Sequence, residues 1–173
     1  VISTSLRAHS NSDMLADKFV EGALQAGHEV EKISLIGKDI RFCRGCLACQ
    51  KLGKCVINDD VDGIMQKVLH ADVVVWATPI YYFEMSGQMK VLIDRMNALY
   101  TLDYQFRDVY MLTTAAEEDP EVPSRAISGL TGWTDCFPKS RLADTLFCGG
   151  VVEPNAISGH SKLDEAYEMG LHC

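Results

Sequence analysis

Apolar and polar residues follow two alternating periods along this chain, one typical of helices and one typical of strands. Residues 73–78 form a continuous apolar and β-branched run, which predicts a central parallel strand buried on both faces. Residues 87–99 place apolar side chains at positions i, i+3, i+4 and i+7, which predicts a helix with one buried face. The pattern therefore indicates strands and helices in alternation.

The same two periods assign the rest of the chain. Further strands are expected at residues 1–4, 29–36, 109–114 and 145–152, and further helices at 13–26, 61–69, within 126–137 and at 162–169. Residues 41–58 are expected to form a loop that carries cysteines. Five strands that alternate with helices require parallel crossover connections. We therefore expect a doubly wound α/β sheet in one domain that covers residues 1–173.

Charge and hydropathy exclude several kinds of partner. The formal net charge is −8 and no cluster of Lys and Arg offsets it, so binding to nucleic acid is not expected. No apolar run approaches the roughly 20 residues that span a bilayer, so no membrane segment is expected. The chain starts in an apolar segment without a basic leader, and a cytoplasmic location is the expectation.

A hydroxyl-rich loop joins the first strand to the first helix, at residues 3–12. The N-terminus of a helix offers unpaired N–H groups and a positive dipole end, which together favour an anion such as phosphate. The loop has no glycine and so is neither a P-loop nor a dinucleotide fingerprint. Two interpretations stay open: a phosphate site, or a polar surface loop in which Asn11 or Ser12 caps the helix.

Two further loops follow the carboxyl ends of predicted strands, where open α/β sheets bind ligands. Residues 79–86 contain three consecutive aromatic side chains, which suit a planar ligand or a dimer interface. Residues 113–118 are small and polar, consistent with close approach to the edge of a ring.

Four of the seven cysteines gather in one short segment, as Cys43, Cys46, Cys49 and Cys55. Such a cluster indicates a metal or redox site, whereas the other three are expected to be buried as small apolar residues or to have no role. Asp59 and Asp60 are expected to cap the helix at 61–69. Asp94 and Arg95 are expected to form structural ion pairs near a helix end.

Three stretches together resemble the NADPH-dependent FMN reductase family of flavodoxin-like proteins. They are residues 5–12, residues 43–60, and residues 71–95, which contain the Pro-x-Tyr segment that begins at Pro79. The resemblance extends over nearly the whole chain and is weakest at residues 117–144. It implies a three-layer sandwich whose five-stranded parallel sheet has the order 2-1-3-4-5.

The resemblance also implies which residues bind FMN. In this family the first loop holds the phosphate, the Pro-x-Tyr loop lies along the isoalloxazine, and the loop after the fourth strand touches the ring. These roles carry over to Ser5, Arg7, Ser10, Asn11 and Ser12, to Pro79, Ile80, Tyr81, Tyr82 and Phe83, and to Thr113 and Thr114. The chain has Leu6 where the family usually has Pro and Ser10 where it usually has Gly, so the turn geometry and the role of Arg7 are open.

The cysteine spacing is similar to that of the iron–sulfur flavoproteins, a branch of the same family. The resemblance implies that Cys43, Cys46, Cys49 and Cys55 hold a 4Fe–4S cluster, for which four thiolates are the required ligand set. A zinc site, a loop without metal, and a redox thiol pair formed by Cys43 and Cys46 remain alternatives.

The expected function is that of an FMN-dependent oxidoreductase that takes hydride from NAD(P)H and passes electrons to a small molecule or a redox protein. No side chain is expected to act as an acid or base, because the flavin performs the chemistry. The resemblance also implies a homodimer or homotetramer. The alternatives are a non-enzymatic carrier reduced by ferredoxin, and a metal-binding protein without flavin.

Overall fold

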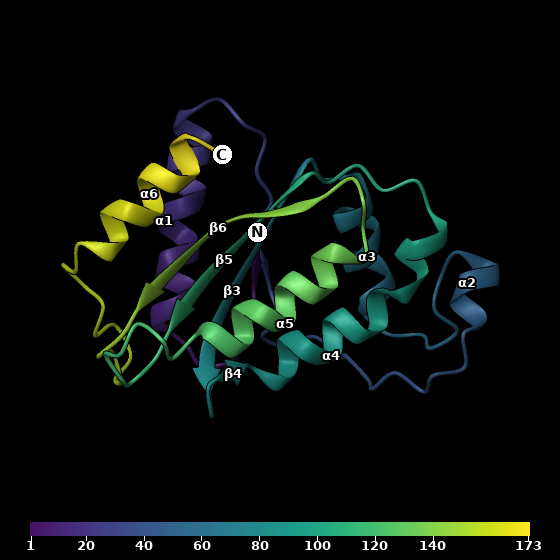
Figure 1. The fold of residues 1–173 in the computed structure, drawn as a ribbon, viewed down its shortest axis with the longest axis horizontal. Coiled ribbons are helices and arrows are strands. Elements are labelled where there is room, and N and C mark those ends of the chain that lie inside the picture. The colour runs from purple at the N-terminus through teal and green to yellow at the C-terminus, as the bar shows by residue number, and fades with distance from the viewer.

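A parallel sheet of five strands crosses the centre of the molecule in the order β2-β1-β3-β5-β6 (Figure 1). The structure is a computed structural model that describes residues 1–173. The strands are β1 (Ile2–Ser3), β2 (Ile33–Ser34), β3 (Val73–Tyr81), β5 (Asp108–Thr114) and β6 (Arg141–Cys148). A short strand β4 (Glu84–Met85) folds back antiparallel on β3. The predicted order 2-1-3-4-5 is confirmed once this extra strand is left out of the count.

Helices cover both faces of the sheet and complete the three layers (Figure 1). One face is covered by α1 (Asn11–Gln25) and α6 (Lys162–Leu171). The other is covered by α3 (Val61–His70), α4 (Gly87–Arg95) with the 3₁₀ segment η1 (Met96–Thr101), and α5 (Ser124–Asp135). The small helix α2 (Ala48–Leu52) lies apart from both layers, within the cysteine loop. No helix is long and apolar enough to span a membrane.

The helices α1 and α6 pack with their backbones in direct contact. A Cβ atom at Gly22 would lie 2.0 Å from the carbonyl oxygen of Tyr167, and one at Gly170 would lie 2.0 Å from the carbonyl oxygen of Phe19. Only glycine fits at either position without displacing a backbone. The last helix therefore fixes the position of α1, whose N-terminus faces the loop at residues 3–10.

Several predicted boundaries are wrong. The strand expected at 29–36 is ordered as a strand only at residues 33–34, because it is an edge strand paired with the two-residue β1. The last strand spans Arg141–Cys148 rather than 145–152, and Gly150, with a φ of 72°, follows its end. The helix expected at 87–99 becomes 3₁₀ after Arg95, and α2 interrupts the loop expected at 41–58.

Candidate functional site

A cleft of about 480 Å³ opens where the parallel strands end. The chain reaches β2 and β3 on opposite sides of β1, so the cleft lies at the point where strand order reverses, the usual ligand site of doubly wound sheets. Its volume falls within the roughly 300–1,000 Å³ of small-molecule sites. It is lined by Ser5, Arg7, Ser10, Asn11, Ser12, Pro79, Ile80, Tyr81, Tyr82, Phe83, Thr114, Ala115, Ala116, Glu117, Val122, Val151 and Val152.

The N-terminus of α1 presents free donors to this cleft. Ser10 is the N-cap, and its Oγ accepts the N–H of Asp13 at 3.2 Å. The N–H groups of Asn11 and Ser12 have no acceptor in the protein. The alternative in which Asn11 or Ser12 caps this helix is therefore wrong, because Ser10 occupies the cap position. The unpaired N–H groups at a helix start are nevertheless the donor set that suits a phosphate.

Asn11 uses its side chain for another purpose. Its Nδ2 donates to the carbonyl of Glu153 at 3.0 Å, and its Oδ1 accepts the N–H of Ile157 at 3.1 Å. Both amide atoms therefore hold residues 153–157 against the start of α1. Only the backbone N–H of Asn11 remains available to a ligand.

Arg7 lies at the same edge of the cleft. Its guanidinium donates to the carbonyl of Val152 at 2.6 Å and pairs with the Glu153 carboxylate at 3.3 Å. Its side chain is 46% exposed, so the pair is at the surface and is worth little stability. In this arrangement Glu153 neutralises the cation that the sequence placed in the phosphate loop.

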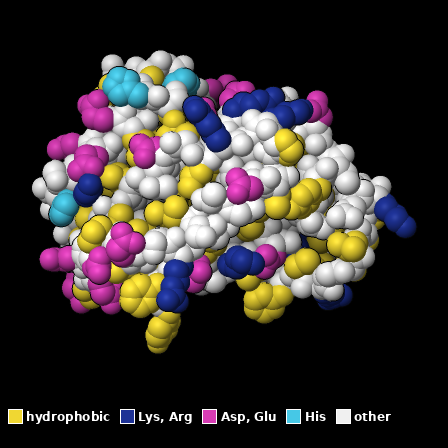
Figure 2. Space-filling view, in the orientation of Figure 1, with side chains coloured by type: hydrophobic (Ala, Val, Ile, Leu, Met, Phe, Trp, Pro, Cys, Tyr) yellow, Lys and Arg dark blue, Asp and Glu magenta, His cyan; other side chains and the backbone are white.

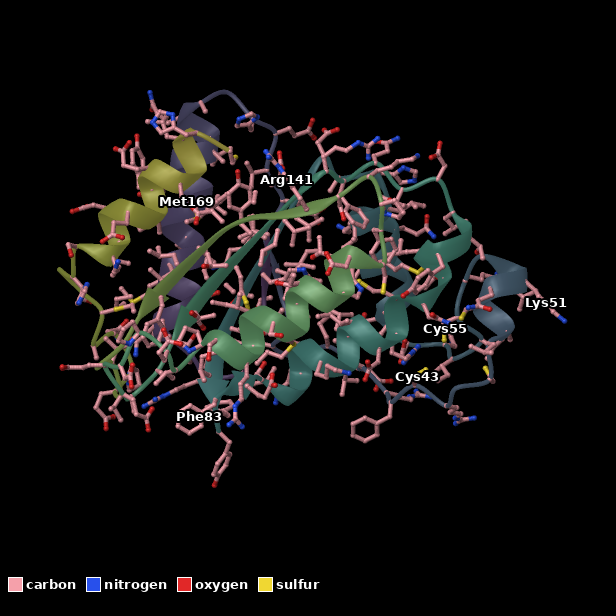
Figure 3. The ribbon with its side chains drawn as sticks, viewed as in Figure 1. Cys43, Lys51, Cys55, Phe83, Arg141 and Met169 are labelled. Atoms are coloured by element: carbon pink, nitrogen blue, oxygen red, sulfur yellow. The ribbon has the colours of Figure 1, made fainter.

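The aromatic residues form the tip of a hairpin. Tyr81 on β3 pairs with Glu84 on β4, which leaves Tyr82 and Phe83 as a two-residue turn. Their φ angles are 51° and 68°, the positive values that a tight hairpin of this length requires and that bulky residues rarely adopt. Tyr82 is 97% exposed. Figure 2 shows hydrophobic side chains that project from the lower edge, and Figure 3 places Phe83 there, below α5.

Three buried hydroxyl groups connect the base of this hairpin to the first loop. The Oγ of Ser86 lies 3.1 Å from the Oγ1 of Thr4 and 3.1 Å from the Oγ1 of Thr78, and it caps α4. All three residues are fully buried. This network, which the sequence analysis did not identify, holds the first loop and the aromatic hairpin in fixed relation.

The loop after β5 contributes only part of what was expected. Thr114 lines the cleft, together with Ala115, Ala116 and Glu117. Thr113 does not line it, because its hydroxyl is buried and donates to the carbonyl of Leu146 at 3.1 Å. Neighbouring side chains of a strand point to opposite faces, so both threonines cannot face the same ligand.

Residues after β6 complete the wall of the cleft, and the sequence analysis missed them. The N–H of Val151 donates to the carbonyl of Ala115 at 3.0 Å, which ties the two loops together. A Cβ atom at Gly149 would lie 2.3 Å from the carbonyl oxygen of Glu117. The signal was present in the Gly149-Gly150 pair, which ends an apolar run at the carboxyl end of the last strand.

The cysteine loop lies on a separate part of the molecule: Cys49 belongs to α2, and Figure 3 shows Cys43 and Cys55 at the same end, away from Phe83. All four of its cysteines are free thiols: Cys43 and Cys46 are exposed, whereas Cys49 and Cys55 are half-buried. No group of three or more potential ligands lies close enough to hold one metal ion. The donor set suits an iron–sulfur cluster, but the loop is not closed around a metal position.

Hydrogen bonds from the end of α4 and from η1 reach two of these thiols. The Nη2 of Arg95 lies 3.3 Å from the Sγ of Cys55, and the Nδ2 of Asn97 lies 3.6 Å from the Sγ of Cys49. Cys43 accepts only the nearby N–H of Gly45, at 3.4 Å. The half-buried cysteines are therefore held by another element, and the exposed ones are not.

A buried ion pair closes the base of the cysteine loop. Both side chains of the Arg95–Asp59 pair are inaccessible to solvent, with Nη1 and Oδ2 2.7 Å apart. Burial acts to raise the pKa of the Asp59 carboxyl, but hydrogen bonds from Arg95, Arg41 N–H and Val61 N–H outweigh it and lower that pKa. The predicted structural ion pair of Arg95 is thus present. The predicted capping of α3 is confirmed only in part: Asp59 accepts the N–H of Val61, but the side chain of Asp60 makes no capping hydrogen bond.

Two proteins with known names are similar to part of this chain. An iron-sulfur flavoprotein of Archaeoglobus fulgidus is 38% identical over 92 residues, which cover 53% of this chain and 42% of the relative. An iron-sulfur flavoprotein of Methanocaldococcus jannaschii is 37% identical over 107 residues, which cover 62% and 55%. The chain thus spans about half the length of the curated relatives it matches.

Solved structures share the fold at low sequence identity. An azoreductase from Bacillus anthracis superposes with a TM-score of 0.71 at 13% identity, covering 99% of this chain and 97% of the other. An NAD(P)H:quinone oxidoreductase from Methanothermobacter marburgensis gives 0.68 at 15% identity, covering 99% and 94%. At such identities the likeness establishes the flavodoxin-like fold alone.

The family model for NADPH-dependent FMN reductase matches residues 1–119, which contain the first loop, the cysteine loop, the aromatic hairpin and the end of β5. The chain belongs to the NADPH-dependent FMN reductase family.

Proposed function

We propose that residues 1–173 form a single FMN-binding domain that acts as an NAD(P)H-dependent oxidoreductase. One observation carries the proposal: the hydroxyl-rich loop and the aromatic hairpin, far apart in the sequence, line the same cleft. Family membership supports the same assignment. A cleft with anion donors at one end and aromatic side chains at the other matches a phosphorylated planar ligand.

The phosphate would be held at the N-terminus of α1. The donors there are the N–H groups of Asn11 and Ser12 and the hydroxyls of Ser5, Ser10 and Ser12, none of which titrates. Arg7 would supply a cation beside them if the phosphate replaced Glu153 as its partner.

The isoalloxazine would lie against the hairpin and the loop after β5. Pro79, Ile80, Tyr81, Tyr82 and Phe83 supply the apolar wall, and Thr114 supplies a polar group near the ring edge. Thr113 would not contact the flavin; its hydroxyl would support the site indirectly, through its hydrogen bond from β5 to β6. When bound, FMN supplies hydride acceptance and electron transfer, and the protein positions it and limits the access of water.

We further propose that Cys43, Cys46, Cys49 and Cys55 hold an iron–sulfur cluster. The four thiols within one loop and the iron-sulfur flavoprotein names of two relatives support this. The cluster would let a two-electron donor feed a one-electron acceptor.

Anaerobic purification with joint analysis of flavin, iron and acid-labile sulfide tests both proposals. We expect about one FMN and about four iron per chain, the latter set by a 4Fe–4S cluster. A preparation without flavin bands would refute the oxidoreductase. One zinc, or no metal, would refute the cluster alone.

Steady-state oxidation of NADPH and NADH then separates an enzyme from a carrier. We expect turnover well above that of free FMN. Its absence, with reduction by ferredoxin instead, would favour a non-enzymatic electron carrier, the role that the cysteine loop also fits.

The exposed hairpin supports a homodimer or homotetramer. Tyr81, Tyr82 and Phe83 are consecutive and 54%, 97% and 50% exposed, and a contiguous exposed apolar patch of this kind is typical of an interaction surface. Light scattering of the FMN-loaded protein should give the mass of an oligomer, and a monomer would refute this part of the proposal.

A further inference from the structure

The hydrogen-bond donors at the end of α4 and in η1 divide the four cysteines of the loop into two pairs that differ in burial and in hydrogen bonding. Cys49 and Cys55 are half-buried and accept hydrogen bonds from Asn97 and Arg95, whereas Cys43 and Cys46 are exposed and receive none from another element. Position in the sequence does not produce this division, because all four lie within one short segment. The division comes from the contact between the loop and η1.

Arg95 is placed to fix both ends of the loop at once. Its Nη1 donates to the carbonyl of Arg41 at 2.5 Å, at the loop's start, and to Asp59 at 2.7 Å, at its end. Asp59 in turn accepts the N–H of Arg41 at 3.0 Å. The planar guanidinium with five donors suits such a junction, and an ammonium with its single nitrogen does not.

The same side chain has a donor that the protein leaves unused. Arg95 is 2% exposed, and its Nε–H is buried without an acceptor. An unsatisfied buried donor is costly, so it is rare in a folded protein. The guanidinium whose Nη2 reaches Cys55 therefore carries one more donor than the metal-free protein satisfies, as expected of a site that receives a further electron-rich group.

We propose that Arg95 and Asn97 are positioning residues for a four-thiolate iron–sulfur centre, in which Cys49 and Cys55 form the preset half and Cys43 and Cys46 close over it. This inference rests on the cluster proposed above. Hydrogen bonds to the sulfurs of a cluster raise its reduction potential, so the two side chains would set the potential as well as the geometry.

Two variants test the proposal, and a third on the same helix as Arg95 serves as their control. Asn97→Leu removes the donor to Cys49 and keeps the number and branching of the side-chain heavy atoms. Arg95→Lys keeps the positive charge but loses the planar guanidinium, whose several N–H donors contact Arg41, Cys55 and Asp59 at once. Lys90→Gln on the same helix removes an exposed cation, whose partner is Asp94 at 2.6 Å, and touches no cysteine.

The main measurement is the reduction potential of the reconstituted cluster, followed by electron paramagnetic resonance. We expect Asn97→Leu to retain iron but to shift the redox equilibrium about tenfold toward the oxidised form, or about 59 mV for one electron. We expect Arg95→Lys to lose at least half of its iron, and Lys90→Gln to match the wild type.

A second measurement uses the metal-free protein, so it holds even if Arg95→Lys assembles no cluster. Hydrogen exchange at the Arg41 amide, which donates to Asp59, should accelerate at least about tenfold in Arg95→Lys. The substitution removes the forked guanidinium hydrogen bonds that hold Asp59 against this amide, and a tenfold change corresponds to about 1.4 kcal/mol.

The outcomes separate this inference from the one beneath it. If the wild type holds iron and Asn97→Leu and Arg95→Lys behave as Lys90→Gln does, the positioning role is wrong and the cluster stands. If the wild type holds no iron while it retains FMN, the cluster and the positioning role both fail, and the flavin site is untouched.

Discussion

The proposed flavin cleft and the cysteine loop differ in how the fold builds them. The cleft collects residues from the ends of four strands, and its polar side chains at Ser5, Ser10 and Ser12 are almost fully buried before any ligand is present. The cysteine loop is one segment with two exposed thiols and no converged ligand set. The cleft is preformed by topology, whereas the proposed cluster would have to bring the four thiols of the loop together.

This difference follows from where each site draws its contacts. Adjacent strand ends are fixed by the hydrogen bonds of the sheet, so loops far apart in sequence meet at fixed spacing. A loop that carries all its own ligands is held at fewer points, here at its base by Arg95 and Asp59 and at Cys49 by Asn97. For such a site, binding energy is also ordering energy.

The largest effect is expected from Ser10→Asp. Aspartate caps a helix as well as serine does, so α1 should remain intact. Its carboxylate would face the flavin phosphate, and like charges about 4 Å apart repel by roughly 4 kcal/mol near a protein surface, so we expect FMN affinity to fall at least about 100-fold. Fluorescence titration measures the affinity. Ser161→Asp, at the exposed N-cap of α6, is the control with the same added charge and should bind FMN normally.

The two sites should also separate by mutation of a ligand. Cys46→Ser is expected to remove most of the iron, because a cluster needs four thiolates, while the flavin content stays at the wild-type level. Cys136→Ser changes an exposed thiol outside the loop and should leave both unchanged. Parallel loss of flavin and iron in Cys46→Ser would show that the sites are not independent.

A smaller effect is expected from Gly149→Ala. The new Cβ would meet the carbonyl oxygen of Glu117 at 2.3 Å, and overpacking of this kind costs about 1–3 kcal/mol. The displaced loop is a wall of the cleft, so FMN affinity should fall about tenfold, or 1.4 kcal/mol. Gly63→Ala, with open space around its Cβ, is the control. Unchanged affinity in Gly149→Ala would mean that this wall does not touch the flavin.

The smallest effect is expected in the stability of the protein at acidic pH. The cleft's donors do not titrate, whereas the base of the cysteine loop depends on Asp59, whose pKa is lowered in the folded protein. A lowered folded-state pKa stabilises the fold above the unfolded value of about 3.9, and this stability is lost as the pH falls through the folded-state value. The free energy of unfolding of the metal-free wild type should therefore fall more steeply below about pH 4 than that of Asp59→Asn. Equal slopes in denaturant titrations would contradict this.

Local periodicity located the strands, the helices and the loops between them, whereas the sheet order and the expected cleft residues came from the resemblance to the family. The strand at 73–78 and the loops that follow each strand could be located from alternation alone. Val151 and Val152 were missed because the last strand was placed four residues too late, which put them inside it. The error came from reading Gly149 and Gly150 as part of an apolar run.

Other details depend on contacts between distant segments. The side chain of Asn11 was expected to face phosphate, but its partners at residues 153–157 lie more than 140 positions away. Thr113 and Thr114 are adjacent on β5 and face opposite sides of the sheet, and the residue types alone do not show which of them lines the cleft. Spacing likewise identified the cysteines without showing which two would be held by η1.

The close backbone contact between α1 and α6 links binding to the far end of the chain. Because Gly22 and Gly170 leave no gap between the helices, α1 cannot shift without carrying α6 with it. A ligand seated on the first turn of α1 would therefore slow the opening of a helix that contributes nothing to the cleft. Hydrogen exchange at the amides of α6 would then report whether flavin occupies the cleft.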